Sequence, residues 1–193
     1  LPISAALIDI TYDPIESLSD MEQAMRPDAP LIHEEWGDNV MQTLDAKTGD
    51  VDKAFRTADT VVRERFRTGR HMSVPLETRG CLASYDSATG LMTVWSSTQI
   101  PHVLRSNIAI FLGFPEHRIR AVAPDVGGGF GPKGHVFPEE ILISFLAQKY
   151  ACPVKWIEDR SENLAASMHA KHQCVEGEIA LDANGLIVGL KAR

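Results

Sequence analysis

Short stretches in which hydrophobic residues alternate with polar ones, or form brief apolar runs, recur along this chain of 193 residues. Such stretches, when Gly, Pro, Asn or Asp bound them, are typical of β-strands. A turn at 87–90 separates two of them, so residues 81–86 and 91–97 are predicted to form a hairpin. The pattern as a whole predicts strands at 5–12, 60–68, 81–86, 91–97, 118–124 and 153–159, and two more that meet at 182–185.

Other segments carry the end signals of helices. Asp50 is a suitable N-cap, while Pro101 and Pro138 stand where a first helical turn tolerates proline. The predicted helices cover 51–59, 102–113 and 138–150, and a further one begins at 161–163. Strands and helices together indicate an α+β fold, with mixed sheets and flanking helices.

Residues 16–47 are acidic and interrupted by Pro27, Pro30 and Gly37. We interpret this stretch as a connector with a short helical piece.

Composition excludes some classes of protein. Hydrophobic residues make up 44% and charged residues 23%, as in ordinary globular proteins, and the net charge of -7 argues against a binder of nucleic acid. Three cysteines without close spacing suggest reduced thiols and a cytoplasmic location. No apolar run is long enough to cross a membrane, and a chain that starts at Leu1 is expected to be a piece of a longer protein.

A glycine-rich loop after the strand at 118–124 is the most informative segment. A plain turn would need only one or two of its glycines, whereas this density lets backbone N–H groups approach an anionic or oxo ligand. The G-x-G-x-x-G match at 129–134 is weak evidence for a dinucleotide site, because Pro132 and Pro138 place the next helix after the motif. A P-loop is excluded, since no Gly-Lys-Ser/Thr follows. The glycines are Gly127, Gly128, Gly129, Gly131 and Gly134.

Two further clusters have simpler interpretations. His169, His172 and Cys174 resemble part of a zinc site, but a fourth ligand is missing and residues three apart on a strand face opposite sides. Glu139 and Glu140 stand at a helix start. There we expect the carboxylates to interact with the positive end of the helix dipole rather than to act in acid–base catalysis.

The glycine loop, APDVGGGFGPK, resembles the glycine-phenylalanine-glycine segment of molybdenum hydroxylases of the xanthine dehydrogenase/aldehyde oxidase type. The likeness extends over PLETRGCLASYD, LMTVWSSTQIPHVLR and PVKWIEDRSENL, in order and spacing from about Asp50 to Leu164. Within that family the sequence looks most like carbon monoxide dehydrogenase large subunits.

The resemblance implies a domain plan and an activity. Residues 1–28 would be the tail of a preceding small α/β domain, 29–48 a connector, and 49–193 the incomplete N-terminal part of a molybdopterin-binding domain. The parent enzyme would hydroxylate or oxidise a small molecule (an aldehyde, an N-heterocycle or carbon monoxide) with oxygen from water. Its general base and remaining cofactor loops would lie outside these residues, so the chain alone is expected to be inactive.

The resemblance also implies cofactors and partners. They are molybdopterin in its cytosine dinucleotide form, FAD and 2Fe–2S clusters on flavin and iron–sulfur subunits, and an oligomeric assembly. A non-catalytic α/β module that binds a cofactor or nucleotide through the glycine loop is the alternative.

Residue by residue, the resemblance gives Gln99 the role of an amide that hydrogen-bonds a molybdenum oxo ligand. Phe130 would place its ring beside the metal, and no side chain here would bind the metal directly. Glu77 matches a recurrent acidic position, for which an ion pair is as good an interpretation as a place near the cofactor. Gly134 stands where purine-oxidising members have glutamate, which puts a purine substrate in doubt. The backbone contributors would be Gly128, Gly129 and Gly131. Gln99 and the Gly129–Gly131 backbone are therefore predicted to converge on one concave surface, each about 3 Å from a shared oxo group.

Overall fold

The computed structural model describes residues 7–193. By its contacts the chain forms two compact units, which are described separately. The central unit is Arg65–Glu176. The terminal unit consists of the described part of Leu1–Glu64 together with Gly177–Arg193.

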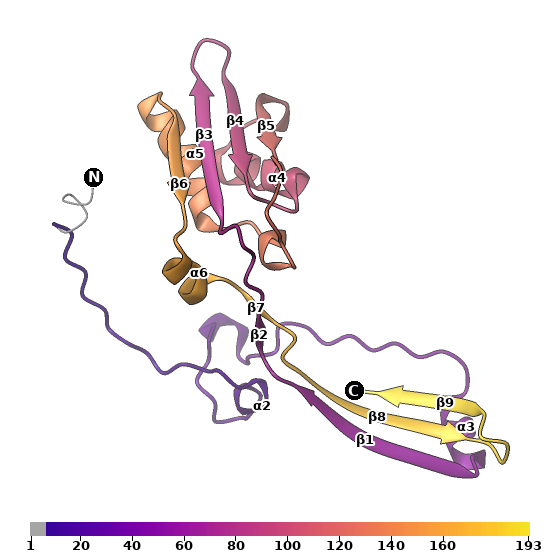
Figure 1. The fold of residues 1–193 in the computed structure, drawn as a ribbon. Helices are drawn as coiled ribbons and strands as arrows, with labels where there is room; N and C mark the ends of the chain where they lie inside the picture. The colour runs from indigo at the N-terminus through magenta and orange to yellow at the C-terminus, as the bar shows by residue number, and fades with distance from the viewer. Residues whose placement is uncertain (1–6) are drawn as a thin grey trace. The chain divides into compact units, whose positions relative to one another are not determined.

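The central unit contains a four-stranded mixed sheet with the strand order β5-β4-β3-β6 (Figure 1). β3 pairs antiparallel with β4 and β6, and β4 pairs parallel with β5. The predicted hairpin is confirmed, because Asp86 lies opposite Leu91 and Gly90 takes the positive φ of 70° that the turn requires. The four strands are β3 (Gly80–Asp86), β4 (Leu91–Ser96), β5 (Ile119–Val122) and β6 (Val154–Ile157).

Two helices, α4 (Pro101–Leu112) and α5 (Pro138–Tyr150), pack against this sheet. Both begin with proline, as predicted, and α4 ends at Gly113 with φ of 68°. Alternate strand residues face the helices, which explains the period-2 pattern in the sequence. The buried core is Cys81, Ala83, Met92, Val94, Leu104, Ile108, Ala109, Ile119, Ile143 and Ala147.

Smaller elements complete the central unit. β2 (His71–Met72) pairs with β7 (His169–Ala170), and 3-10 helices precede β5 (η2, Glu116–Arg118) and α5 (η3, Pro132–Gly134). α6 (Arg160–Ala166) begins one residue earlier than the sequence suggested, because Asp159 is its N-cap and accepts from the N–H of Glu162 at 2.8 Å.

The terminal unit contains the sheet β1-β8-β9, formed by β1 (Thr60–Thr68), β8 (Gln173–Leu181) and β9 (Ile187–Ala192). β1 and β8 also run into the central unit. α3 (Val51–Thr57) packs on β9, and the predicted cap is confirmed, since Asp50 accepts from the Lys53 N–H at 2.9 Å. The acidic connector holds two short helical pieces, α2 (Met21–Ala24) and η1 (Glu34–Trp36).

The strand predicted at 5–12 is wrong for residues 7–12, which form no strand; residues 5 and 6 lie outside the described part. Leu7 and Tyr12 are 82% and 80% exposed. Apolar composition alone does not make a strand, because a ladder needs a second strand to accept its hydrogen bonds, and no described strand pairs with this segment.

No helix within residues 7–193 is both long and apolar enough to span a bilayer.

Candidate functional site

The glycine-rich loop connects β5 to α5 through a strained backbone path. Gly128 and Gly131 have φ of 93° and 101°, and Phe130 between them has φ of 53°, which is unusual for a residue with a side chain. The Phe130 ring is 72% exposed. The α-helix begins only at Pro138, after the G-x-G-x-x-G match, so the arrangement differs from a dinucleotide-binding turn.

Gln99 follows β4 and lies directly on this loop. Its side-chain Oε1 accepts from the Gly131 N–H at 3.1 Å. The backbone N–H of Gln99 donates to the carbonyl of Lys133 at 2.9 Å. The approach is so close that a Cβ on Gly129 would lie 2.5 Å from Gln99 Cδ. The predicted approach of Gln99 to the backbone of residues 129–131 is therefore confirmed, while their reach to an oxo group stays a prediction.

Glu77 and Lys133 hold the loop from the other side. Glu77 Oε2 accepts from Lys133 Nζ at 2.7 Å and from the Gly127 N–H at 2.7 Å. The Lys133 side chain is only 1% exposed. Burial acts to raise the pKa of Glu77, but the hydrogen bonds from Lys133 and Gly127 outweigh it and lower the pKa overall. The ion-pair interpretation of Glu77 is confirmed.

Three donors on this surface have no hydrogen-bond partner among the described residues: Gln99 Nε2 and the backbone N–H groups of Gly129 and Phe130. All three are neutral, and no carboxylate is bonded to any of them. Neutral donors grouped in this way suit an anionic or oxo group, which they stabilise without introducing a competing charge. These three donors are therefore suited to an oxo or anionic group.

A buried ion-pair network supports the strand that follows Glu77. Arg79 Nη2 contacts Glu158 Oε1 at 2.6 Å, and both side chains are almost fully buried. Asn163 Nδ2 donates to Glu158 Oε2 at 2.8 Å, and the Arg79 guanidinium lies 3.7 Å from the centre of the Phe137 ring. Sequence reasoning missed this network; its only signal was the charged residues placed next to β3 and β6.

Arg160 ties the same segment to α6. Its Nη2 donates to the carbonyl of Pro75 at 2.6 Å and to that of Leu76 at 3.0 Å, immediately before Glu77. Its Nη1 donates to Asn163 Oδ1 at 2.8 Å, which joins Arg160 to the network around Glu158.

The glutamates at the start of α5 take part in a helix cap and in polar pairs with neighbouring side chains. Glu140 Oε2 accepts from the Phe137 N–H at 2.9 Å and its Oε1 accepts from Ser96 Oγ at 2.5 Å. Burial raises the pKa of Glu140. Glu139 Oε2 lies 3.5 Å from Arg79 Nη1.

The cysteine and histidine residues do not gather into one site. Cys174 Sγ accepts from Arg65 Nε at 3.1 Å, and Cys81, Cys152 and Cys174 are all free thiols. Within residues 7–193, no group of three or more His, Cys, Asp or Glu side chains is placed to hold a metal ion.

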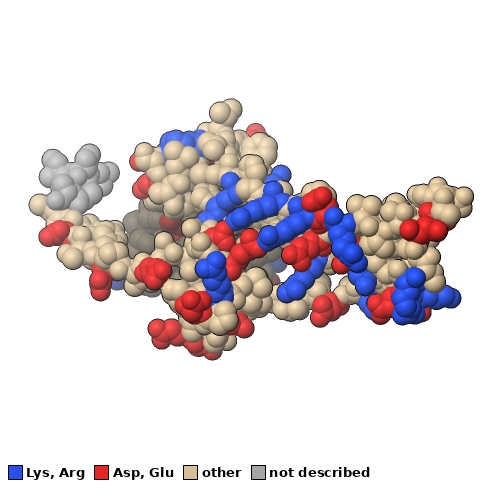
Figure 2. Space-filling view, turned by 90° about the horizontal axis from the view of Figure 1, so that it is seen from below, with Lys and Arg blue, Asp and Glu red and all other residues tan. Residues whose placement is uncertain are grey.

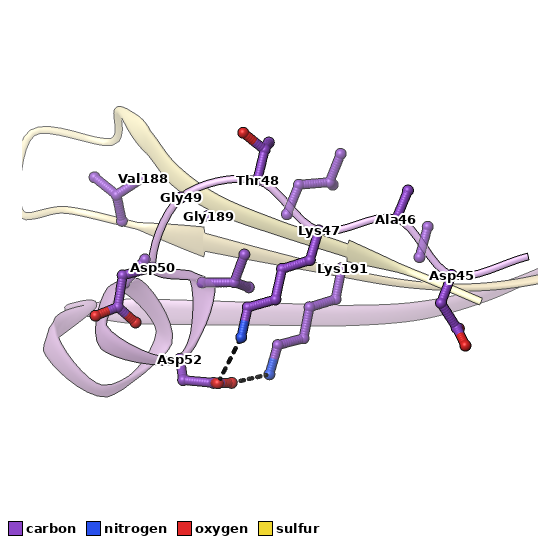
Figure 3. A pocket seen from close by; sticks show the side chains of 14 residues that line it. Asp45, Ala46, Lys47, Thr48, Gly49, Asp50, Asp52, Val188, Gly189 and Lys191 are labelled. Carbon is purple, nitrogen blue, oxygen red and sulfur yellow. Dashed lines mark hydrogen bonds and ion pairs between the residues drawn. The ribbon is translucent and has the colours of Figure 1, made fainter.

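A groove of about 750 Å³ in the terminal unit contains none of the predicted site residues (Figure 3). It lies between β9 and residues 45–54. In this groove the Asp52 carboxylate forms ion pairs with two lysines. Its Oδ2 lies 3.1 Å from Lys47 Nζ, and its Oδ1 lies 3.6 Å from Lys191 Nζ. Both lysines thus share one carboxylate. On the face seen in Figure 2, Lys and Arg are likewise interspersed with Asp and Glu.

Known proteins resemble this chain over most of its length. The model of the molybdopterin cofactor-binding domain family matches residues 32–193. The nicotine 6-hydroxylase large subunit of Paenarthrobacter nicotinovorans is 41% identical over 96% of the chain, and the carbon monoxide dehydrogenase large chain of Afipia carboxidovorans is 34% identical over 96%. The chain spans 22% and 24% of these two relatives.

The crystal structure of quinoline 2-oxidoreductase from Pseudomonas putida 86 superimposes with a TM-score of 0.85 and 37% identity, covering 100% of this chain and 24% of that one. The family model covers most of the chain, and its match includes both Gln99 and the glycine loop. The chain belongs to the molybdopterin cofactor-binding domain family.

Proposed function

We propose that this chain is the N-terminal part of the molybdenum-binding subunit of an oxidoreductase that hydroxylates a small molecule with oxygen from water. The observation that carries the proposal is the convergence of Gln99 with the glycine loop, which leaves three neutral donors pointing to no partner within the described residues. The family model supports the cofactor, because its match includes every one of these residues.

In this proposal each residue has a distinct task. Gln99 Nε2 and the Gly129 and Phe130 N–H groups would hold the cofactor by donating to its oxo or anionic groups. Gly128 and Gly131 give the backbone the positive φ that this presentation requires. The exposed Phe130 ring would cover the reacting face and exclude water from it. When bound, the molybdenum cofactor supplies the two-electron oxidation chemistry.

For the substrate we propose an N-heteroaromatic compound. Two of the most similar proteins are named for nicotine and quinoline, at 41% and 37% identity, whereas the carbon monoxide dehydrogenase large chain is 34% identical. Gly134 supplies no side chain that could orient a purine. The assay below also tests carbon monoxide and an aldehyde as competing substrates.

The cofactor form and the assembly are part of the same proposal. We propose the cytosine dinucleotide form of molybdopterin as the cofactor. Because relatives are named as a large subunit and as a subunit of a complex, we also expect flavin and iron–sulfur subunits that carry FAD and 2Fe–2S clusters. We further propose a cytoplasmic enzyme in which residues 1–28 belong to a preceding domain, 29–48 connect, and 49–193 begin the cofactor domain.

The test uses the full-length subunit, co-produced with its partner subunits. Oxidation of nicotine, quinoline, an aldehyde and carbon monoxide is compared, together with molybdenum content and the nucleotide released by acid hydrolysis. Gln99→Ala should lower kcat per bound molybdenum by roughly 100-fold, the loss typical of one donor in an oxyanion-type site. Gln148→Ala, an exposed glutamine on α5, should retain full activity. Absence of molybdenum, or full activity in Gln99→Ala, contradicts the proposal.

A further inference from the structure

We propose that Glu77 and Lys133 are a pair of positioning residues that set the register between the glycine loop and Gln99. This inference rests on the proposed function, since it gives a task to residues that do not themselves face the proposed cofactor. It goes beyond the ion pair as such. The pair would hold the loop at Gly127 through Glu77 and at Gln99 through the Lys133 backbone.

The first contact is between Glu77 and the start of the loop. One carboxylate oxygen, Oε2, accepts at 2.7 Å from both Lys133 Nζ and the Gly127 N–H. The backbone adds a third bond, because the Glu77 N–H donates to the Gly127 carbonyl at 3.2 Å. A Cβ on Gly127 would lie 2.6 Å from the Glu77 Cβ, so the two backbones meet without room for a side chain. Glu77 thus fixes where the loop begins.

The second contact is between Lys133 and Gln99. The Lys133 carbonyl accepts from the Gln99 N–H at 2.9 Å and from Thr98 Oγ1 at 3.4 Å. Gln99 in turn accepts from the Gly131 N–H at 3.1 Å. Lys133 therefore connects the Glu77 carboxylate through its side chain to Gln99 through its backbone. The loop is held at Gly127 and Gly131. Of the three N–H groups between these points, that of Gly128 donates to the Val126 carbonyl, while those of Gly129 and Phe130 have no partner among the described residues.

The charges explain why this connection is rigid. The Lys133 side chain is 1% exposed, and Glu77 is the partner that compensates its charge in the described structure. A buried ammonium without its carboxylate is costly, so Lys133 is restrained to the position that Glu77 sets. Glu77 lies outside the hydrophobic core, and its neighbour Leu76 is 97% exposed. The pair is thus built around the loop and not around the core of the fold.

A double variant separates positioning from stability. Glu77→Ala with Lys133→Met, in the full-length subunit with its partner subunits, removes the connection without leaving a buried unpaired charge. We expect the melting temperature to change by only a few degrees. Hydrogen exchange of the loop amides, followed on peptides that cover residues 124–131, should become at least about 10-fold faster, since the Gly127 amide loses its acceptor. The kcat per bound molybdenum should fall at least about 10-fold with little change in KM.

Glu139→Gln is the matched control. It removes an ion pair of similar exposure, 32% for Glu139 against 37% for Glu77, and should leave loop exchange and kcat as in the wild type. If the double variant does not fold, Glu77→Asp, which keeps the charge but shortens the reach, should accelerate loop exchange on its own.

The positioning role is overturned if the double variant exchanges its loop amides at the wild-type rate and keeps the wild-type kcat per bound molybdenum. A lowered melting temperature with unchanged exchange and kcat also overturns it, in favour of a purely structural pair. A wild-type enzyme without molybdenum would instead contradict the proposed function. The exchange measurement would still decide the role of the pair, because it does not require activity.

Discussion

Single glycines in the loop have different tasks, which the space around each one reveals. Gly129 faces Gln99, Gly127 faces Glu77, and Gly134 has nothing within 4 Å of an added Cβ. Only the first two are needed for a close approach between segments. The density of glycines predicted a loop whose backbone N–H groups can approach a ligand. It did not reveal which glycines permit the close contacts with Gln99 and Glu77.

Gly129→Ala tests the contact with Gln99. The new Cβ would lie 2.5 Å from Gln99 Cδ, so the side chain must move and the bond from the Gly131 N–H to Oε1 is lost. Because Gln99 is exposed and flexible, the fold should lose only about 1 kcal/mol, the value of one hydrogen bond, while activity falls about 10-fold or more. Urea unfolding and turnover measure the two effects. Gly134→Ala is the control, and equal losses in both variants would contradict the interpretation.

The thiols should differ in reactivity. Burial, with Glu140 and Glu139 nearby, raises the pKa of Cys81 to about 12, whereas Cys152 is exposed at the end of α5. The thiolate is the reactive form, so iodoacetamide at pH 8 should label Cys152 in the native protein and Cys81 only after unfolding. Peptide mass spectrometry measures both rates. Labelling of native Cys81 at the rate of Cys152 would show that the core around β3 is open.

At the scale of elements, local signals predicted most of the fold. Proline at the first turn, glycine at the helix end and alternation in strands gave α4, α5 and the β3–β4 hairpin close to their observed bounds. The strand predicted at 5–12 is wrong over residues 7–12, because strand formation depends on a partner that composition does not reveal.

In the site, too, local motifs predicted some residues, while long-range contacts were not predicted. Gln99 and the glycine loop were predicted from motifs, and the structure brings them into contact. The Arg79–Glu158–Asn163 network was not predicted, because its members are 79 and 5 residues apart and no local pattern joins them. Long-range polar pairing is decided by how β3, β6 and α6 come together.

Glu158→Gln tests how that network connects these elements. Burial acts to raise the pKa of Glu158, but hydrogen bonds from Arg79 and Asn163 outweigh it and lower the pKa below its ordinary value of 4.5. A lowered folded-state pKa means that the carboxylate stabilises the fold above pH 4.5, and that this contribution is lost as the pH falls through the folded-state pKa. At pH 7 the variant should be less stable by on the order of 3 kcal/mol, because Arg79 loses its buried partner.

Urea unfolding at a series of pH values measures this effect. The difference between wild type and variant should shrink as the pH falls below 4.5, where protonated Glu158 comes to resemble glutamine. Glu116→Gln, which removes an exposed pair with Arg105, should change stability by less than about 1 kcal/mol at any pH. A pH-independent difference in Glu158→Gln would contradict the charge-based explanation.

At the scale of the whole molecule, the central unit leaves apolar surface uncovered. The helices α4 and α5 bury one face of the sheet, yet their outer sides carry Ile110, Phe111, Leu142 and Phe145 at 75%, 67%, 53% and 42% exposure. Three of these residues, Phe111, Leu142 and Phe145, also line a groove of about 560 Å³ whose other lining residues are mostly apolar. A contiguous patch of this kind favours contact with another surface, unlike scattered single residues.

This exposed helical face should make the chain associate with itself. Residues 1–193, studied by themselves, should self-associate as their concentration rises, because contact between two copies removes apolar surface from water at about 25 cal/mol per Å². Light scattering over a concentration series measures the size. Replacing Phe111 and Leu142 by lysine should shift the protein toward monomer with little loss of stability, since both side chains are more than half exposed. Leu186→Lys, which changes an exposed apolar residue in the turn between β8 and β9, is the control and should not alter association. A wild-type chain that stays monomeric at every concentration would mean that this face is stable in water, and that the central unit needs no partner to cover it.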